Sequence, residues 1–231
     1  MDHPQAEPWH RCVTVDVPMS NDPPPDEPLP LFPLGTVLFP GGLLPLQVFE
    51  VRYLNMIGRC HKMDQPFGVV ALAQGHEVRQ AGAAEERLHE VGTLARITRL
   101  EQPQAGLMLI ECRGAQRFRI ERSSRLKHGL WVADIRLLPD DPAVQVPDDL
   151  RHVAETLRQF HQRLRERTPI APPAPDNADY SDCAWVANRW CELLPLPLMT
   201  RQRLLALDNP LLRLELVADL LARASIGSGA A

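Results

Sequence analysis

The chain has 231 residues, of which 45% are hydrophobic and 23% are charged, a balance typical of a globular protein with one large or two small domains. Its formal net charge of −4 and sequence pI near 6.1 exclude a global basic field for nucleic acid, although a local basic patch remains compatible with them. The five cysteines form no CxxC pair, so we expect reduced, buried thiols and a cytoplasmic location.

Residues 1–28 are predicted to form a disordered, proline-rich extension. The segment "SNDPPPDEP" is acidic and rich in proline, and such a composition cannot bury enough apolar surface to become ordered. Little before Met19 has a structured pattern, so Met19 is a candidate for the true start of the protein.

The stretch from Leu29 to Phe49 contains no charged residue and is long enough to span a bilayer as a helix. Its four prolines argue against a helix, because each removes an amide donor and costs about 3 kcal/mol in a helix interior. We instead predict two apolar strands, Leu31–Phe39 and Leu43–Val48, joined by a turn at Pro40-Gly41-Gly42 and buried on both faces.

Residues 29–140 as a whole are predicted to form a β pseudo-barrel subdomain with one helix. The helix follows from apolar residues at one-face spacing, namely Tyr53, Met56, Ile57 and Cys60. Further strands are predicted at residues 67–74, 91–102, 106–121 and 130–138. The segment 106–121 is either one long strand or a hairpin broken near Gly114. A polar loop is predicted between the strands at 67–74 and 91–102. Several short strands without a βαβ rhythm favour a small closed or partly closed barrel.

Residues 141–225 are predicted to be helical. Apolar residues alternate by three and four over residues 148–167, at Leu150, Val153, Leu157, Phe160 and Leu164. Asp148 or Asp149 is expected to cap this helix. Later helices are expected behind Ser181/Asp182, from Thr200, and from Pro210 to about Ala224, with 226–231 as a frayed tail. We predict that the four helices form a bundle against the barrel, which makes the fold class α+β.

Several motifs along the chain belong together: "PLFPLGTVLFPGGLLPLQVFEVRY", "FGVV", "VGTLARI", "GAQRFRI" and "ELLPLPLMTRQRLLALDNPLLRLELV". They resemble the N-terminal, substrate-binding domain of Lon proteases, and most of all the stand-alone bacterial proteins that carry only this domain. The resemblance covers nearly everything from Leu29 to about Leu221. It implies a PUA-like β pseudo-barrel followed by a helical bundle, which agrees with the elements predicted above.

Lon proteases also have an ATPase module and a Ser-Lys protease module. This chain has no G-x-x-x-x-G-K-[ST] phosphate loop and no HExxH, GxSxG or GxGxxG motif. Its histidines and cysteines match no metal-ligand spacing. We therefore expect a non-enzymatic protein that uses no cofactor and no metal.

The resemblance implies binding of polypeptide, in particular of exposed apolar segments of unfolded or damaged proteins. It further suggests an adaptor in protein quality control, with a protease or chaperone as a partner and without membrane contact. Such a site is physically an apolar groove or an unpaired strand edge. The candidate lining residues are Phe39, Leu43, Leu44 and Trp131, although large apolar strand residues usually belong to the core.

Two alternatives remain open. The first is RNA binding, because PUA-like barrels often bind RNA and a basic strip is present: Arg113, Arg117, Arg119, Arg122, Arg125 and Lys127. Arg117 and Arg119 alternate with apolar residues, however, as in a half-buried strand, and few aromatic residues are available to stack on bases. The second alternative is a scaffold with one dedicated protein partner.

Overall fold

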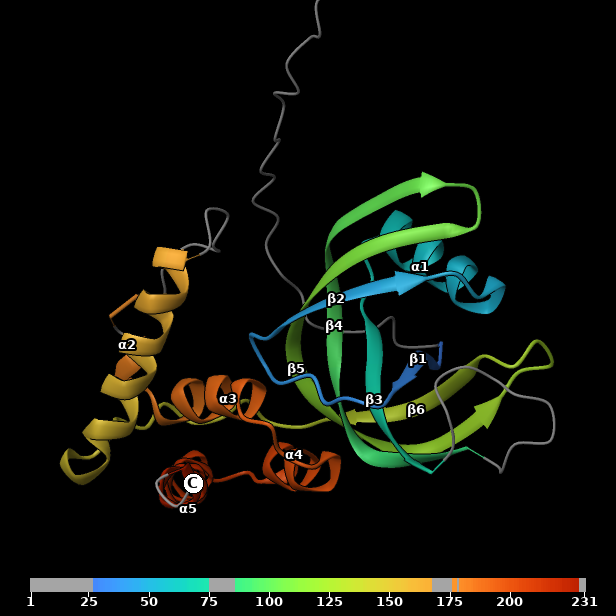
Figure 1. Cartoon of the computed structure of the whole chain (residues 1–231). Helices are drawn as coiled ribbons and strands as arrows, with labels where there is room; N and C mark the ends of the chain where they lie inside the picture. Colours follow the sequence, from blue (N-terminus) through green and yellow to red (C-terminus); the bar gives the residue numbers. More distant parts are fainter. Residues whose placement is uncertain (1–26, 75–85, 168–175, 178, 229–231) are drawn as a thin grey trace, which may run out of the picture.

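The computed structural model describes residues 27–74, 86–167, 176–177 and 179–228, and it has an α+β fold (Figure 1). The β part contains β1 Leu29–Leu34, β2 Leu43–Val48, α1 Val51–Met63, β3 Phe67–Gln74, β4 Arg87–Gln104, β5 Leu107–Arg125 and β6 Trp131–Leu137. The helical part contains α2 Arg151–Arg167, α3 Cys183–Leu193, α4 Leu198–Ala206 and α5 Pro210–Ser228. Short 3-10 turns precede α2 and α3.

The strands pair in a ring. β1 runs parallel to β3 and antiparallel to β6, β4 lies between β3 and β5, and β6 pairs with β5 to close the circle. Strand β2 lies outside this ring, because β5 is its only neighbour among the described strands. The predicted closure is therefore present in the strand pairing, whereas the relation to PUA-like folds stays a prediction.

The second predicted strand and the turn at Pro40-Gly41-Gly42 are present, but the first strand is Leu29–Leu34 and not Leu31–Phe39, and the two strands do not pair with each other. β1 ends at Leu34 and pairs with β3 and β6, whereas β2 pairs with β5. The reason lies in the turn at Pro40-Gly41-Gly42. Its main chain is hydrogen-bonded to Gly114, which attaches the chain to β5 and not to β1. Burial on both faces is confirmed for β1 and wrong for β2.

Most other elements of the β part confirm the sequence pattern. Helix α1 buries the predicted face, Tyr53, Met56, Ile57 and Cys60. Strand β3 has the predicted bounds, and β5 is one long strand that is not broken at Gly114. A Cβ atom at this glycine would lie 2.2 Å from the carbonyl oxygen of Phe39, so a close approach of two backbones requires the glycine. The predicted polar loop falls largely outside the described residues.

The helix starts are partly as predicted. The Asp182 side chain accepts a hydrogen bond from the Trp185 amide and caps α3, and Asn209 accepts two from the start of α5. Asp148 and Asp149 instead form a 3-10 turn before α2, which begins at Arg151. Helix α4 begins two residues before Thr200, and α5 extends past Ala224 to Ser228, into the range expected to fray.

The four helices gather around α3, which contacts α2, α4 and α5. In Figure 1, α5 is seen end-on while α2 and α3 lie across the view, so the axes cross steeply. The four helices therefore pack together, while their classification as a four-helix bundle stays a prediction. One apolar cluster joins the two parts, because Phe39 and Leu138 of the β part pack with Leu157 and Val186 of the helices.

A buried ionic network crosses the same boundary. The guanidinium of Arg213 on α5 lies 2.6 Å from the Asp141 carboxylate, and Arg117 on β5 lies 3.0 Å from the same carboxylate. Arg213 also contacts Asn188 on α3. All three ionic side chains are almost completely buried. Removing one partner of such a group leaves an uncompensated buried charge, so the network holds the two parts in one arrangement.

Candidate peptide-binding edge

The turn at Pro40-Gly41-Gly42 positions the start of β2. Gly41 has φ +75°, a conformation that glycine adopts without strain. The Gly41 amide donates to the Gly114 carbonyl, and the Gly114 amide donates to the Gly42 carbonyl, each at 2.8 Å. These bonds fix which main-chain groups of β2 face its neighbour.

No described strand pairs with the other edge of β2. Main-chain groups alternate in direction along a strand, and the Gly42 carbonyl faces β5. Residues 44, 46 and 48 therefore also face β5, while Leu43, Pro45 and Gln47 direct their main-chain groups outward. Pro45 fits this assignment, because proline is tolerated only where no ladder donor is needed. Leu43 and Gln47 thus offer donors and acceptors to an added strand.

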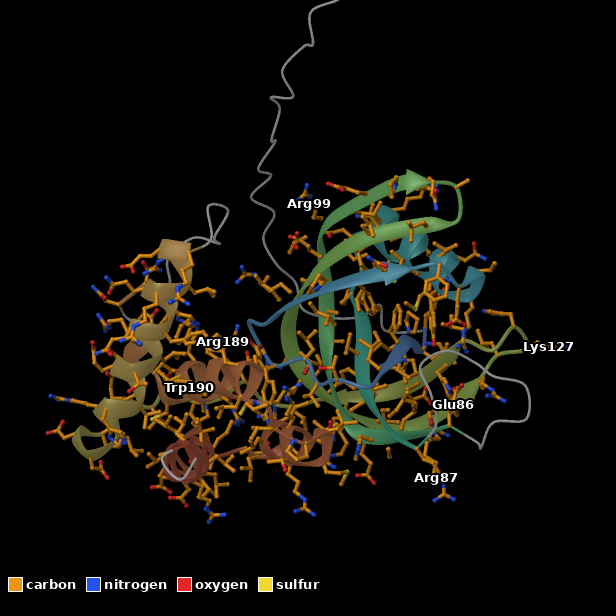
Figure 2. All side chains as sticks on the ribbon, viewed as in Figure 1. Glu86, Arg87, Arg99, Lys127, Arg189 and Trp190 are labelled. Atoms are coloured by element: carbon orange, nitrogen blue, oxygen red, sulfur yellow. The ribbon has the colours of Figure 1, made fainter. Side chains whose placement is uncertain are left out.

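Exposed apolar side chains lie at the two ends of β2. Leu43 is 51% exposed, Phe49 57% and Val51 71%, the last two lying where β2 passes into α1. A hollow of about 410 Å³ lies on the other side of β2, over this strand and its neighbours β5 and β4. Its lining residues are Pro45, Leu46, Gln47, Arg99, Glu101, Leu109, Ile110 and Glu111. Figure 2 labels Arg99 at this side of the barrel. A strand edge flanked by apolar side chains is a known mode of peptide binding.

The four predicted lining residues do not come together. Leu43 lies on the free edge, and Leu44 is half-buried against the barrel core. Phe39 is fully buried between the two parts of the molecule. Trp131 begins β6, and its indole Nε1 donates to Glu86 at 2.6 Å. The sequence analysis did not name Phe49 and Val51 as candidate lining residues. The only sequence signal for them is their position between the end of β2 and the start of α1.

The predicted basic strip is also divided. Arg117 points inward and donates to the carbonyl oxygens of Leu205 and Leu207 as well as to Asp141. Arg119 pairs with Glu90 at 3.1 Å and Arg122 with Asp134 at 3.3 Å. A strip whose arginines are buried or matched by acids gives little net attraction for a phosphate backbone.

The remaining members of the strip are exposed. The Arg125 guanidinium lies 5.8 Å from the Trp131 ring centroid, while Arg113 and Lys127 face solvent. Lys127 is at the far end of the barrel in Figure 2. No contiguous basic face for RNA is formed by these six residues in the described structure.

A polar cluster on α3 holds the turn that starts β2. The Arg189 guanidinium donates to the Pro40 carbonyl at 2.7 Å and lies 3.0 Å from the Glu192 carboxylate. Figure 2 shows Arg189 between α2 and the barrel. A Cβ atom at Gly42 would lie 2.1 Å from Glu192 Oε1, so carboxylate and turn are in close contact. Burial raises the pKa of Glu192 to about 7, although Arg189 and Arg201 favour its charged form.

The four cysteines that the structure describes are buried, free thiols. Burial raises the pKa of the Cys60 thiol to about 11 and that of Cys191 to about 12, so both stay protonated near neutral pH. Across the residues that the structure describes, no three His, Cys, Asp or Glu side chains are arranged to hold a metal. In the same part of the chain, no helix combines the length and hydropathy needed to cross a membrane.

The family model of the ATP-dependent protease La (LON) substrate-binding domain matches residues 28–223, and the chain belongs to this family. A Lon N-terminal domain protein from Xanthomonas campestris is 31% identical, with a TM-score of 0.63, and the match covers 84% of this chain and 96% of that one. The α+β fold is thus that of a Lon N-terminal domain.

More distant relatives agree. The N-terminal domain of Mycobacterium avium complex Lon protease is 17% identical with a TM-score of 0.53 and covers 83% of this chain and 96% of that one, which supports the fold alone. The Lon protease of Anaeromyxobacter dehalogenans is 27% identical over 202 residues, which are 84% of this chain and 23% of that protein. The chain therefore spans about a quarter of the length of the curated Lon proteases it matches.

Proposed function

We propose that this protein binds extended, apolar segments of unfolded or damaged polypeptides at the free edge of β2. The observation that carries the proposal is the unpaired, outward main chain of Leu43 and Gln47 beside the exposed side chains of Phe49 and Val51. Membership of a substrate-binding domain family supports polypeptide as the ligand class.

The chemistry of the edge favours low sequence specificity. Main-chain hydrogen bonds recognise any extended segment, while apolar neighbours favour segments with large apolar residues. Pro45 interrupts the row of donors, which limits affinity and protects the edge from uncontrolled pairing. Weak, tolerant binding of this kind suits recognition of many unfolded chains.

The wider role follows from the same proposal. We infer a non-catalytic adaptor in protein quality control, acting in the cytoplasm beside a protease or chaperone. We also propose two subdomains, 29–140 with a PUA-like pseudo-barrel and 141–225 with the helices, after an extension at 1–28. The RNA hypothesis is not carried further, because Arg117 is committed to the interior and Arg119 and Arg122 are paired.

The test compares binding of reduced, carboxyamidomethylated α-lactalbumin with binding of its native form, at 0.3 M NaCl. The wild-type chain should bind the unfolded form more tightly. The double substitution Leu43→Lys/Val51→Lys should weaken that binding about tenfold, since charges replace apolar contacts at the edge. The matched control Met199→Lys/Leu212→Lys changes similarly exposed residues on α4 and α5 and should leave the affinity unchanged.

Two outcomes contradict the proposal. Equal affinity for folded and unfolded lactalbumin removes the preference for unfolded chains. An equal loss in both double variants assigns the binding to general apolar surface and not to β2. Thermal unfolding of each variant confirms that the compared proteins are folded.

A further inference from the structure

Helix α2 carries one apolar stripe that is covered over only half of its length. Val153 and Leu157, and Leu150 in the 3-10 turn just before the helix, are buried in the helical core. Phe160 and Leu164 continue the same three-four alternation but are 41% and 45% exposed. Isolated exposed apolar residues are ordinary. A stripe of apolar residues that continues past the region where other helices pack on it is an unpartnered helix face.

The packing explains where the cover ends. The Trp190 indole on α3 donates to the Val153 carbonyl at 3.1 Å, and its ring lies 6.5 Å from the Phe160 ring. Trp190 is labelled beside α2 in Figure 2. Helix α2 lies at the margin of the molecule, away from the barrel (Figure 1). The second half of α2 thus reaches past the described helices that pack on its first half.

The charges differ between the two halves as well. In the first half, Arg151 pairs with Asp148 at 2.6 Å and Arg158 with Glu155 at 3.5 Å. In the second half, Arg163, Arg165 and Arg167 form no ion pair with any described residue. The nearest acid along the helix, Glu166, accepts a hydrogen bond from Gln162.

Two of these arginines share the face of the exposed apolar residues. Phe160, Arg163, Leu164 and Arg167 stand at positions i, i+3, i+4 and i+7, which one helix face presents together. Arginine near a helix C-terminus is favoured by the helix dipole, and this accounts for the charges alone. It does not account for the two large, partly exposed apolar side chains on the same face.

We propose that Phe160, Arg163, Leu164 and Arg167 form a docking stripe for an acidic amphipathic helix of a partner protein. The stripe is ~10 Å long at 1.5 Å per residue, about two turns, and its spacing matches helix-on-helix packing. Apolar residues of the partner cover Phe160 and Leu164, and its Asp or Glu residues pair with the two arginines. The stripe is separate from the β2 edge, so this inference does not depend on the proposed function.

The probe is a fluorescein-labelled, 18-residue helical peptide with leucines on one face and glutamates beside them, titrated with the full chain. Arg163→Glu/Arg167→Glu should lower its affinity at least tenfold, and Leu164→Gln should lower it severalfold. The control Arg87→Glu/Lys127→Glu makes the same change in net charge at the opposite end of the molecule (Figure 2) and should stay within about twofold of wild type. A peptide with Gln in place of Glu should bind weakly.

Several results overturn the inference. They are no binding of the peptide by the wild-type chain, equal loss in both charge-reversed variants, and no effect of Leu164→Gln. The inference is also overturned if the peptide does not bind while an RNA oligonucleotide, or vesicles with 30% phosphatidylserine, bind through the same arginines. Circular dichroism identifies any variant that has not folded, and Arg163→Gln/Arg167→Gln then replaces the charge reversal.

Discussion

Strands β1 and β2 come from one uncharged stretch of sequence, yet they occupy opposite kinds of environment. β1 lies inside the ring between β3 and β6, and Leu31 is completely buried. β2 has one neighbour, and Leu43 at its start is half-exposed. The two strands have similar composition, so the difference comes from how many neighbours each strand has.

This difference separates stability from binding within a single run of residues. A large apolar side chain on β1 removes its surface from water on folding and stabilises the fold. The same side chain on the outer face of β2 remains available to another chain. The apolar composition of a segment therefore predicts a strand. The position of that strand in the sheet decides whether its apolar side chains stabilise the core or remain available for binding.

The largest expected effect is the loss of a β1 side chain. Leu31→Ala should reduce the free energy of unfolding by about 3 kcal/mol, because it removes buried methyl groups and leaves a cavity. Leu43→Ala on β2 should change it by less than about 0.5 kcal/mol. Urea unfolding measures both, and similar values for the two would abolish the distinction between the strands.

An intermediate effect concerns the turn between β1 and β2, where Glu192 lies against Gly42. Burial raises the pKa of Glu192 from 4.5 to about 7, so between these values the folded protein holds a proton that the unfolded chain has released. The stability from this proton is present below pH 4.5 and is lost as the pH rises through 7. Glu192→Gln removes this pH dependence.

The expected result is a variant that becomes more stable relative to wild type between pH 5 and pH 8, by on the order of 2 kcal/mol. Urea unfolding at the two pH values measures it. Glu166→Gln on α2 is the control, because that carboxylate is exposed. A constant difference between Glu192→Gln and wild type across this range would contradict the assignment.

Much of the fold was predictable, because it follows from local pattern. The face of α1, the bounds of β3, the cap at Asp182 and the start of α5 all came from spacing and capping chemistry. The free edge did not, because the sheet order depends on which distant strands pair. The sequence pattern predicted a turn before β2 but not its partner, and the structure pairs β2 with β5 from Leu43 to Val48.

The buried ion pairs were also not predicted, because they too depend on contacts between residues that are distant in the sequence. The sequence pattern placed Arg117 on the solvent face of a half-buried strand and did not single out Arg213, but Asp141 in the connecting segment contacts both. An arginine inside an apolar stripe, as at Arg213, is the signal that was available. It could not name its partner, which is 72 residues away in the sequence.

A proline substitution with a small expected effect on stability gives the sharpest test of the edge. Gln47→Pro removes an outward amide donor and keeps the β5 pairing, so unfolding free energy should change by less than about 1 kcal/mol. Leu46→Pro, one residue earlier, removes a donor that faces β5 and should cost about 3 kcal/mol. Binding of unfolded lactalbumin to Gln47→Pro should weaken by about 1 kcal/mol, about fivefold, because one main-chain hydrogen bond is lost. If both prolines were equally disruptive, the outward direction of Gln47 would be wrong, and the proposed binding edge would lose its geometric basis.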